Sequence, residues 1–238
     1  MHVVPHGSCV VRPRPHYVVG GVARKCRMCR ASISIQYPLV EAITGVVFGV
    51  IGYASLPLSL TILALPVAAL LVAIGVYDMR HLLIPDLWAY GCAACAFAGA
   101  CMAVWSGYVA IGVPLLMIEG FVTALPLFIF WLVSRGTWMG LGDAKLALSF
   151  GWLLGIQAGL YAVFAAFVIG AIVSVVLLGM SSRGGRWIWA RMHIGCVGAD
   201  TSAWTMQSEI PFGPFLVLSC FLTWFAMLYG IALPFFPW

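Results

Sequence analysis

The stretch 70-LLVAIGVYDMRHLLIPDLW-88 joins two strongly apolar runs through a short polar segment. The first run ends at Asp78, and the second begins after Pro85. A carboxylate at the end of a long apolar run is costly to place near lipid, and such residues usually serve a function. The stretch therefore predicts two membrane-spanning helices joined by a turn, with a functional acid at the end of the first.

The composition of the whole chain favours the same class of protein. Of the 238 residues, 63% are hydrophobic and only 8% are charged, whereas soluble domains have about 25% charged residues. The apolar residues form long continuous runs and not the short alternating segments of a barrel, which predicts an all-α polytopic bundle in a lipid bilayer. The net charge of +5 does not indicate a nucleic-acid partner, because the basic residues lie in loops beside apolar runs.

The apolar runs predict about seven membrane crossings. The run 144–179 is too long for one crossing, since a helix of that length would extend about 54 Å. Gly151, Gly155, Gly159 and Gln157 mark a turn within it, so we divide it into a short and a long helix. Residues 1–36 form a short cytoplasmic N-terminal segment with the Cys26/Cys29 pair, and residues 37–238 form the membrane domain. The predicted crossings are 37–56, 58–77, 86–106, 109–133, 144–156, 157–179 and 211–236.

The distribution of basic residues sets the orientation of these crossings. With the N-terminus inside, the cytoplasmic segments 1–36, 78–85, 134–143 and 180–210 hold or directly border all 12 Lys and Arg residues. The outer turns near residues 57, 107 and 157 hold none. This asymmetry follows the positive-inside rule, and it places Asp78 and Asp143 at the cytoplasmic rim of the bilayer.

Asp78 and Asp143 are the strongest candidates for catalysis. Two carboxyl groups that approach closely cannot both be ionised, so they share a proton. One then acts as general base on a water molecule while the other acts as general acid, which is the chemistry of peptide hydrolysis without a cofactor. Gly140 and Gly142, just before Asp143 in 138-WMGLGDAKLAL-148, leave room for an extended peptide and permit a positive φ.

Simpler interpretations of these acids stay open. Asp143 is also suited to cap a helix that starts at Ala144, and Asp86 to cap the third span. Asp78 is also compatible with an ordinary solvated loop. Glu119 lies in the middle of a span, and an acid at such a depth is typical of a proton- or cation-coupled transporter. A zinc-dependent hydrolase using His81 and His193 is a third alternative, although the chain has no HExxH motif.

Four stretches in order along the chain resemble the type IV prepilin peptidase family, bacterial inner-membrane aspartic proteases of the GxGD type. The segment 77-YDMRHLLIPDLW-88 resembles the region of the family's first catalytic aspartate, and 140-GLGDAKLAL-148 resembles its GxGD motif. The other two stretches are 24-RKCRMCRASISIQYPLVEAITG-45 and 209-EIPFGPFLVL-218.

The resemblance implies a reaction and a location. The family removes the leader peptide of type IV prepilins or type II secretion pseudopilins at the cytoplasmic face of the inner membrane. Carried over to this sequence, the catalytic pair is Asp78 and Asp143, with Gly140, Gly142 and Lys145 as motif support or substrate contacts. Proteolysis of this kind requires no cofactor. Many members then methylate the new N-terminal amine, with S-adenosylmethionine as the methyl donor.

The N-terminal segment departs from the family pattern. Methylating members usually have an additional first helix and two CxxC pairs in a cytoplasmic loop. This chain starts later, and Cys9-Val-Val-Arg12 stands where the first pair is expected, so the methylation step is left open. A zinc ion at Cys26, Cys29 and Cys9, with His16 as a fourth ligand, is compatible with the ligand chemistry, and so is a reduced pair of thiols. Lys145 either stabilises the ionised aspartate or only contributes to the positive-inside pattern.

Overall fold

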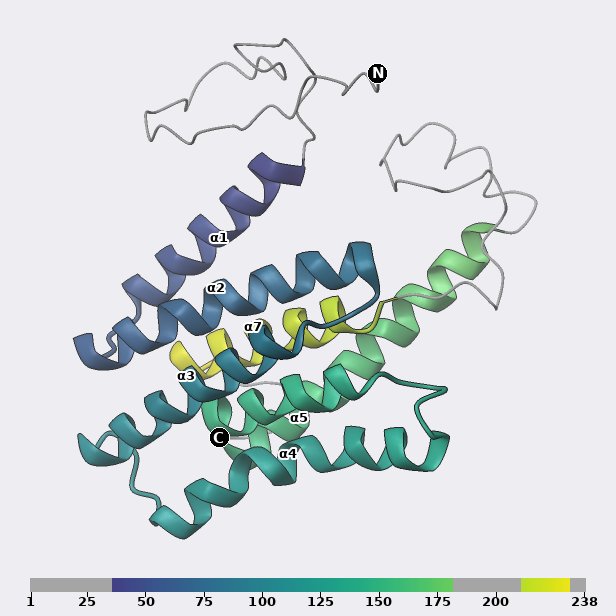
Figure 1. The fold of residues 1–238 in the computed structure, drawn as a ribbon. Coiled ribbons are helices and arrows are strands. Elements are labelled where there is room, and N and C mark those ends of the chain that lie inside the picture. Colours follow the sequence, from purple (N-terminus) through teal and green to yellow (C-terminus); the bar gives the residue numbers. More distant parts are fainter. Residues whose placement is uncertain (1–35, 182–210, 232–238) are drawn as a thin grey trace, which may run out of the picture. The chain divides into compact units, whose positions relative to one another are not determined.

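The computed structural model describes residues 36–181 and 211–231. This part of the chain contains helices and no strand, which confirms the predicted all-α class. By its internal contacts the chain divides into two units, Met1–Ile43 and Thr44–Trp238, and the packing and the site described below lie within Thr44–Trp238. The helices shown in Figure 1 are α1 (Gln36–Tyr53), α2 (Leu58–His81), α3 (Asp86–Trp105), α4 (Val113–Ser134), α5 (Leu141–Ser181) and α7 (Gly213–Leu228).

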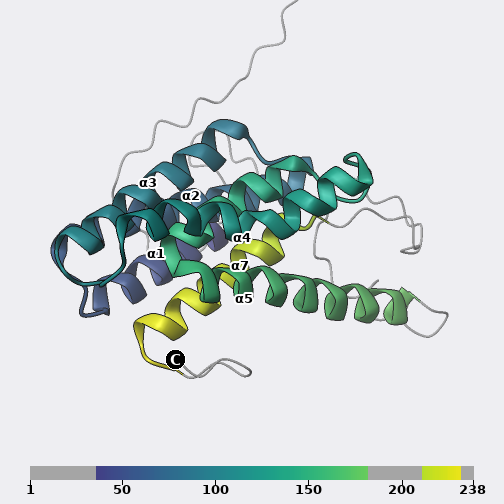
Figure 2. The ribbon, with the colours of Figure 1, turned by 90° about the horizontal axis from the view of Figure 1, so that it is seen from below.

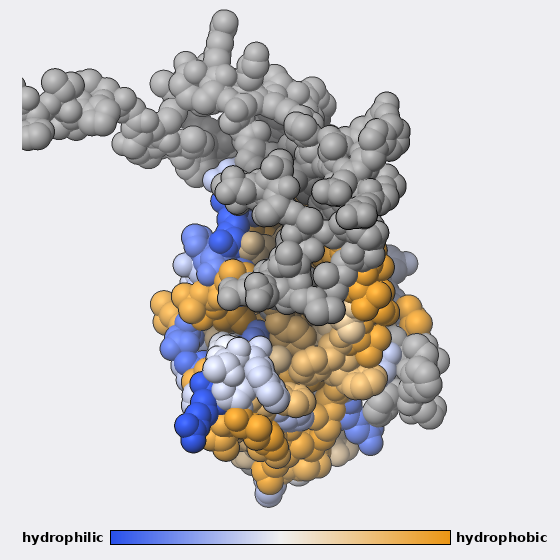
Figure 3. Space-filling model, turned by 90° about the vertical axis from the view of Figure 1, so that its right-hand side faces the viewer, coloured by the Kyte–Doolittle hydropathy of each residue, from blue (hydrophilic) through white to orange (hydrophobic). Residues whose placement is uncertain are grey.

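Four helices of the described ranges, α2 to α5, are long and apolar enough to cross a membrane. Large apolar side chains such as Leu87 and Trp105 are exposed on their surface, and hydrophobic residues cover much of the face shown in Figure 3. Helix α7 is apolar but shorter. It ends at Leu228, and Gly230 has a positive φ. The predicted last helix, 211–236, therefore extends past the point where the helix ends in the described residues.

Helices α2, α3, α5 and α7 form a ring in which each contacts the next, and α4 packs against α5. Small residues allow the α4–α5 contact to be close, as is usual between helices in membranes. A Cβ atom at Gly120 would lie 2.6 Å from the ring of Trp152, and one at Gly151 would overlap the α4 backbone at Glu119. Glycine at these positions is therefore a packing requirement.

Helix α5 consists of two helical segments that meet at Gly155. This residue has φ 80° and ψ 171°, a conformation that is essentially restricted to glycine. Gly155 lines a cavity together with Met227, at the end of α7, whereas the ring of Phe167 lies 4.8 Å from that of Phe212, just before α7 begins. The second segment therefore runs back along α7, as Figure 2 also shows. The predicted division of the run 144–179 is confirmed, with the break one or two residues earlier than expected.

Candidate active site

Asp78 lies in the last turn of α2 and is buried, with 5% of its surface exposed. Helix α2 continues to His81 and stops at Leu82, which has φ 52° and donates its backbone N–H to the carbonyl oxygen of Asp78. The interpretation of Asp78 as a solvated loop residue is therefore wrong. Its side chain points into the unit, where the backbone N–H of Gly213 donates a hydrogen bond of 3.0 Å to Oδ2.

Gly213 is the first residue of α7, and its contact with Asp78 leaves no room for a side chain unless the carboxylate or the start of the helix moves. A Cβ atom at this position would lie 2.6 Å from Asp78 Oδ2. Backbone N–H groups at a helix N-terminus are unpaired within the helix and form a natural site for a carboxylate. Sequence reasoning missed this contact because 135 positions separate the two residues. The only signal was the motif 209-EIPFGPFLVL-218, which carried the resemblance without a role for its glycine.

Asp143 lies in the first turn of α5, two residues after the helix begins at Leu141. The prediction that it caps a helix starting at Ala144 is wrong, because the helix starts earlier and includes it. Only 9% of Asp143 is exposed. Its carboxylate lies close enough to that of Asp78 for the two charges to interact. The structure thus brings together two acids that lie on different helices, 65 positions apart in the sequence.

The two glycines before Asp143 have different environments. Neither is among the residues with positive φ, so that part of the prediction is wrong. A Cβ atom at Gly142 would lie 2.9 Å from Cβ of Ile84, in the turn between α2 and α3. A Cβ atom at Gly140 would meet no atom closer than 3.9 Å, and one of the two atoms at that distance is Asp143 Oδ2. Gly142 is therefore required for packing, whereas Gly140 leaves open space beside the Asp143 carboxylate.

Lys145 forms an ion pair with Asp86, with 2.7 Å between Nζ and Oδ1. Asp86 is the first residue of α3, and the N-cap position belongs to Pro85, so the prediction of Asp86 as a cap is wrong. The Lys145 ammonium also lies 5.3 Å from the ring centre of Tyr90. The Asp86 side chain is 64% exposed, and such pairs contribute little to stability. Lys145 therefore connects the starts of α3 and α5 and pairs with Asp86, not with either buried aspartate.

The predicted metal ligands cannot be placed on this fold. Cys9, His16, Cys26 and Cys29 all lie outside the described residues, as does His193. Within residues 36–181 and 211–231 no three His, Cys, Asp or Glu side chains gather as metal ligands would. The chemical groups that the structure does bring together are two buried carboxyl groups and one backbone amide.

Comparisons with known proteins point to one family. Residues 65–175 match the type IV leader peptidase family, and residues 20–55 match the bacterial peptidase A24 N-terminal domain. The first of these matches includes both Asp78 and Asp143. No solved structure matches the chain significantly.

Several curated proteins named "Prepilin leader peptidase/N-methyltransferase" are similar to this chain. The protein from Aeromonas salmonicida is 29% identical over 214 residues, which cover 87% of this chain and 62% of that protein. The protein from Legionella pneumophila is 30% identical over 206 residues, with 84% and 62% covered. This chain thus spans about 62% of the length of these relatives. Together with the buried aspartate pair, these matches show that the chain belongs to the type IV leader peptidase family, peptidase family A24.

Proposed function

We propose that this chain is an aspartic endopeptidase that removes the leader peptide of type IV prepilins or type II secretion pseudopilins. The observation that carries the proposal is the pair of buried carboxyl groups, Asp78 and Asp143, whose charges interact across two helices. The names of the relatives support the substrate class. The family match over both aspartates supports the assignment of these two residues as catalytic.

The proposed chemistry is peptide hydrolysis by two carboxyl groups that share one proton. One carboxylate takes a proton from a water molecule, and the water oxygen adds to the carbonyl carbon of the scissile peptide bond. The protonated partner gives its proton to the carbonyl oxygen. When the tetrahedral intermediate collapses, the C–N bond breaks, the amine takes a proton from one carboxyl group, and a hydroxyl group of the intermediate returns its proton to the other carboxylate, which restores the shared proton. The Gly213 amide fixes one oxygen of Asp78, which keeps the carboxyl groups oriented before the substrate arrives.

The proposed membrane topology has seven crossings, an internal N-terminus and a cytoplasmic active site in the bacterial inner membrane. The break at Gly155 supports this count, because it gives α5 two antiparallel segments. Asp78 at the end of α2, Asp143 at the start of α5 and Gly213 at the start of α7 then share one face. The basic residues of the chain support the assignment of that face as cytoplasmic.

N-methylation of the new N-terminus is a second candidate activity. The printed names of the relatives include it, and residues 20–55 match the N-terminal domain of the family. S-adenosylmethionine would supply the methyl group. No described residue is assigned a role in that step.

The alternative of a cation-coupled transporter depends on Glu119. This residue lies near the start of α4 and lines a cavity at the end of the unit opposite the aspartates. The protease proposal uses both of the acids that the fold brings together, and we therefore prefer it.

Co-expression with a type IV prepilin tests the proposal, with mass spectrometry of the pilin N-terminus as the readout. Cells with the wild-type chain should yield pilin shortened by its leader, and cells without the chain should yield intact prepilin. An added methyl group on the product reports the second activity separately. If the prepilin keeps its leader in the presence of folded wild-type protein, the proposed substrate class is wrong.

A further inference from the structure

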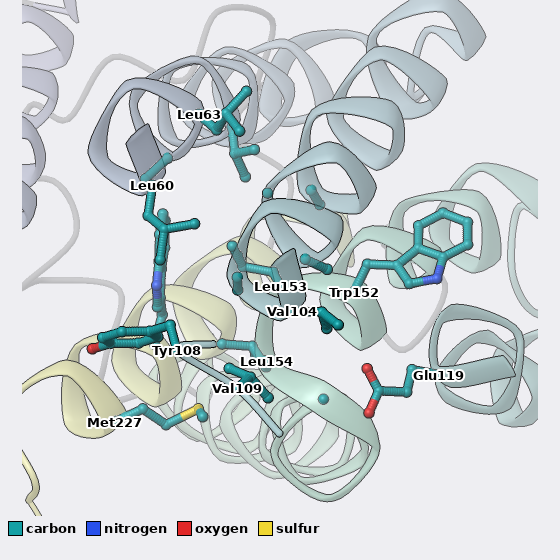
Figure 4. Close-up of a pocket in the computed structure, with 18 of the residues that line it drawn as sticks. Leu60, Leu63, Val104, Tyr108, Val109, Glu119, Trp152, Leu153, Leu154 and Met227 are labelled. Carbon is teal, nitrogen blue, oxygen red and sulfur yellow. The ribbon is translucent and has the colours of Figure 1, made fainter. Parts of the chain in front are cut away.

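A cavity lies at the end of the unit opposite the aspartate pair. It has a volume of about 310 Å³ and is lined by the start of α2, the end of α3, the start of α4, the break in α5 and the end of α7. Small-molecule sites are typically cavities of about this size or larger, with mostly apolar walls and a few polar groups. The walls shown in Figure 4 are largely apolar and include Leu60, Leu63, Val104, Val109, Leu154 and Met227.

Glu119 is the charged residue among the described residues that line this cavity. Only 5% of it is exposed, and its carboxyl group points into the cavity (Figure 4). Within the described residues this carboxyl group has no hydrogen-bond or ion-pair partner, since the Thr123 hydroxyl binds the backbone carbonyl of Glu119 and not its side chain. An acid buried in this way is costly unless a partner compensates it. The proposed proteolysis does not use Glu119.

Aromatic side chains surround the same space. Tyr108, Trp152 and Trp224 line the cavity with Glu119. The indole N–H of Trp152 donates to the carbonyl oxygen of Leu116, which holds this ring in place beside α4. Aromatic rings attract cations through their faces, and groups of such rings bind quaternary ammonium ligands in other proteins. Apolar walls continue from there toward Leu60, where a hydrocarbon chain would fit.

We propose that this cavity binds an amphiphilic amine. Its ammonium group pairs with Glu119, and its apolar part occupies the space between α2, α3 and α7. The charge of Glu119 selects a cation, and the apolar walls select a short hydrocarbon body. This proposal does not depend on the proteolytic function, because its residues lie away from Asp78 and Asp143.

Isothermal titration calorimetry with hexylammonium tests the proposal, using the full chain in lipid nanodiscs. Empty nanodiscs give the background from partitioning into lipid, and 1-hexanol serves as a neutral probe of similar shape. Glu119→Gln removes the charge with almost no change in shape. Glu41→Gln is the matched control, since Glu41 is an exposed acid in α1 that does not line the cavity. Ala100→Phe fills part of the cavity and tests it without a change of charge.

Wild-type protein and Glu41→Gln should bind hexylammonium saturably above the empty-nanodisc background. Affinity should fall at least tenfold in Glu119→Gln and in Ala100→Phe, and 1-hexanol should bind wild type at least tenfold more weakly than hexylammonium. Equal affinity in wild type and Glu119→Gln would overturn the proposal, as would equal affinity for the alcohol or the absence of saturable binding. Thermal melting verifies the fold of each variant. If Glu119→Gln is unfolded, the comparison of wild type with Ala100→Phe decides the proposal.

Discussion

Replacement of Gly213 by alanine should displace the Asp78 carboxylate without removing it. The new Cβ atom would lie 2.6 Å from Asp78 Oδ2, so the carboxylate or the start of α7 has to move. Asp78 is a short side chain in the last turn of a helix and has little freedom to turn away. The movement should break the hydrogen bond of 3.0 Å from the Gly213 amide to Asp78.

The size of the effect follows from that bond. A hydrogen bond to a charged group contributes about 1.5–3 kcal/mol, and its loss in the transition state corresponds to a roughly 10- to 150-fold lower kcat for leader cleavage. The overlap itself should lower the free energy of unfolding by about 1–3 kcal/mol, as overpacking generally does. KM should change less than kcat, because Gly213 contacts the carboxylate and not the peptide.

The assay is cleavage of a purified prepilin by the protein in nanodiscs, with kcat and KM determined separately for each variant. Gly49→Ala is the matched control, since a Cβ atom at Gly49 meets nothing within 4 Å and its kcat should equal that of wild type. Melting temperatures show whether each variant is folded under the assay conditions. A Gly213→Ala protein that is folded and cleaves at the wild-type rate would refute the argument that this amide positions Asp78.

Three further predictions concern the helix packing and the ion pair around the site. Gly155→Ala should lower the free energy of unfolding by about 1–3 kcal/mol, because its φ of 80° and ψ of 171° strain any residue with a side chain; an unchanged melting temperature would contradict this. Gly151→Ala should destabilise the protein by about 1–3 kcal/mol through overlap with the α4 backbone, whereas Gly99→Ala meets only an ordinary contact at 3.8 Å and should melt near wild type. Breaking the exposed Asp86–Lys145 pair with Asp86→Ala should cost at most about 1 kcal/mol; a larger loss in thermal melting would show that the pair has a stronger structural role.

The sequence was most informative where a charged residue stands at the end of a long apolar run. Asp78 and Asp143 were identified because an acid at the end of a long apolar run is costly, and both proved to be buried close together. The division of the run 144–179 was predicted from helix length and glycine content, and Gly155 supplies the break. Both features follow from local composition and from the length of each apolar run compared with the thickness of a bilayer, and a single sequence is enough to see them.

Contacts between distant segments were beyond the reach of the sequence. The Gly213–Asp78 and Lys145–Asp86 contacts span 135 and 59 positions, and no periodicity connects residues so far apart. The capping role assigned to Asp86 was wrong for a local reason. Residues of this type favour the N-cap position in general, but α3 begins at Asp86 itself, Pro85 takes the N-cap position, and the Asp86 side chain pairs with Lys145.

The claim that Asp78 and Asp143 act as one catalytic unit is tested most directly by a double-mutant cycle. Prepilin cleavage is measured for wild type, Asp78→Asn, Asp143→Asn and the double variant, all shown to be folded. Because a general base and its acid partner contribute together, each single variant should lose at least about a thousandfold in kcat, and the double variant should be no worse than either. Substantial cleavage by either single variant, or losses that multiply in the double variant, would contradict the account.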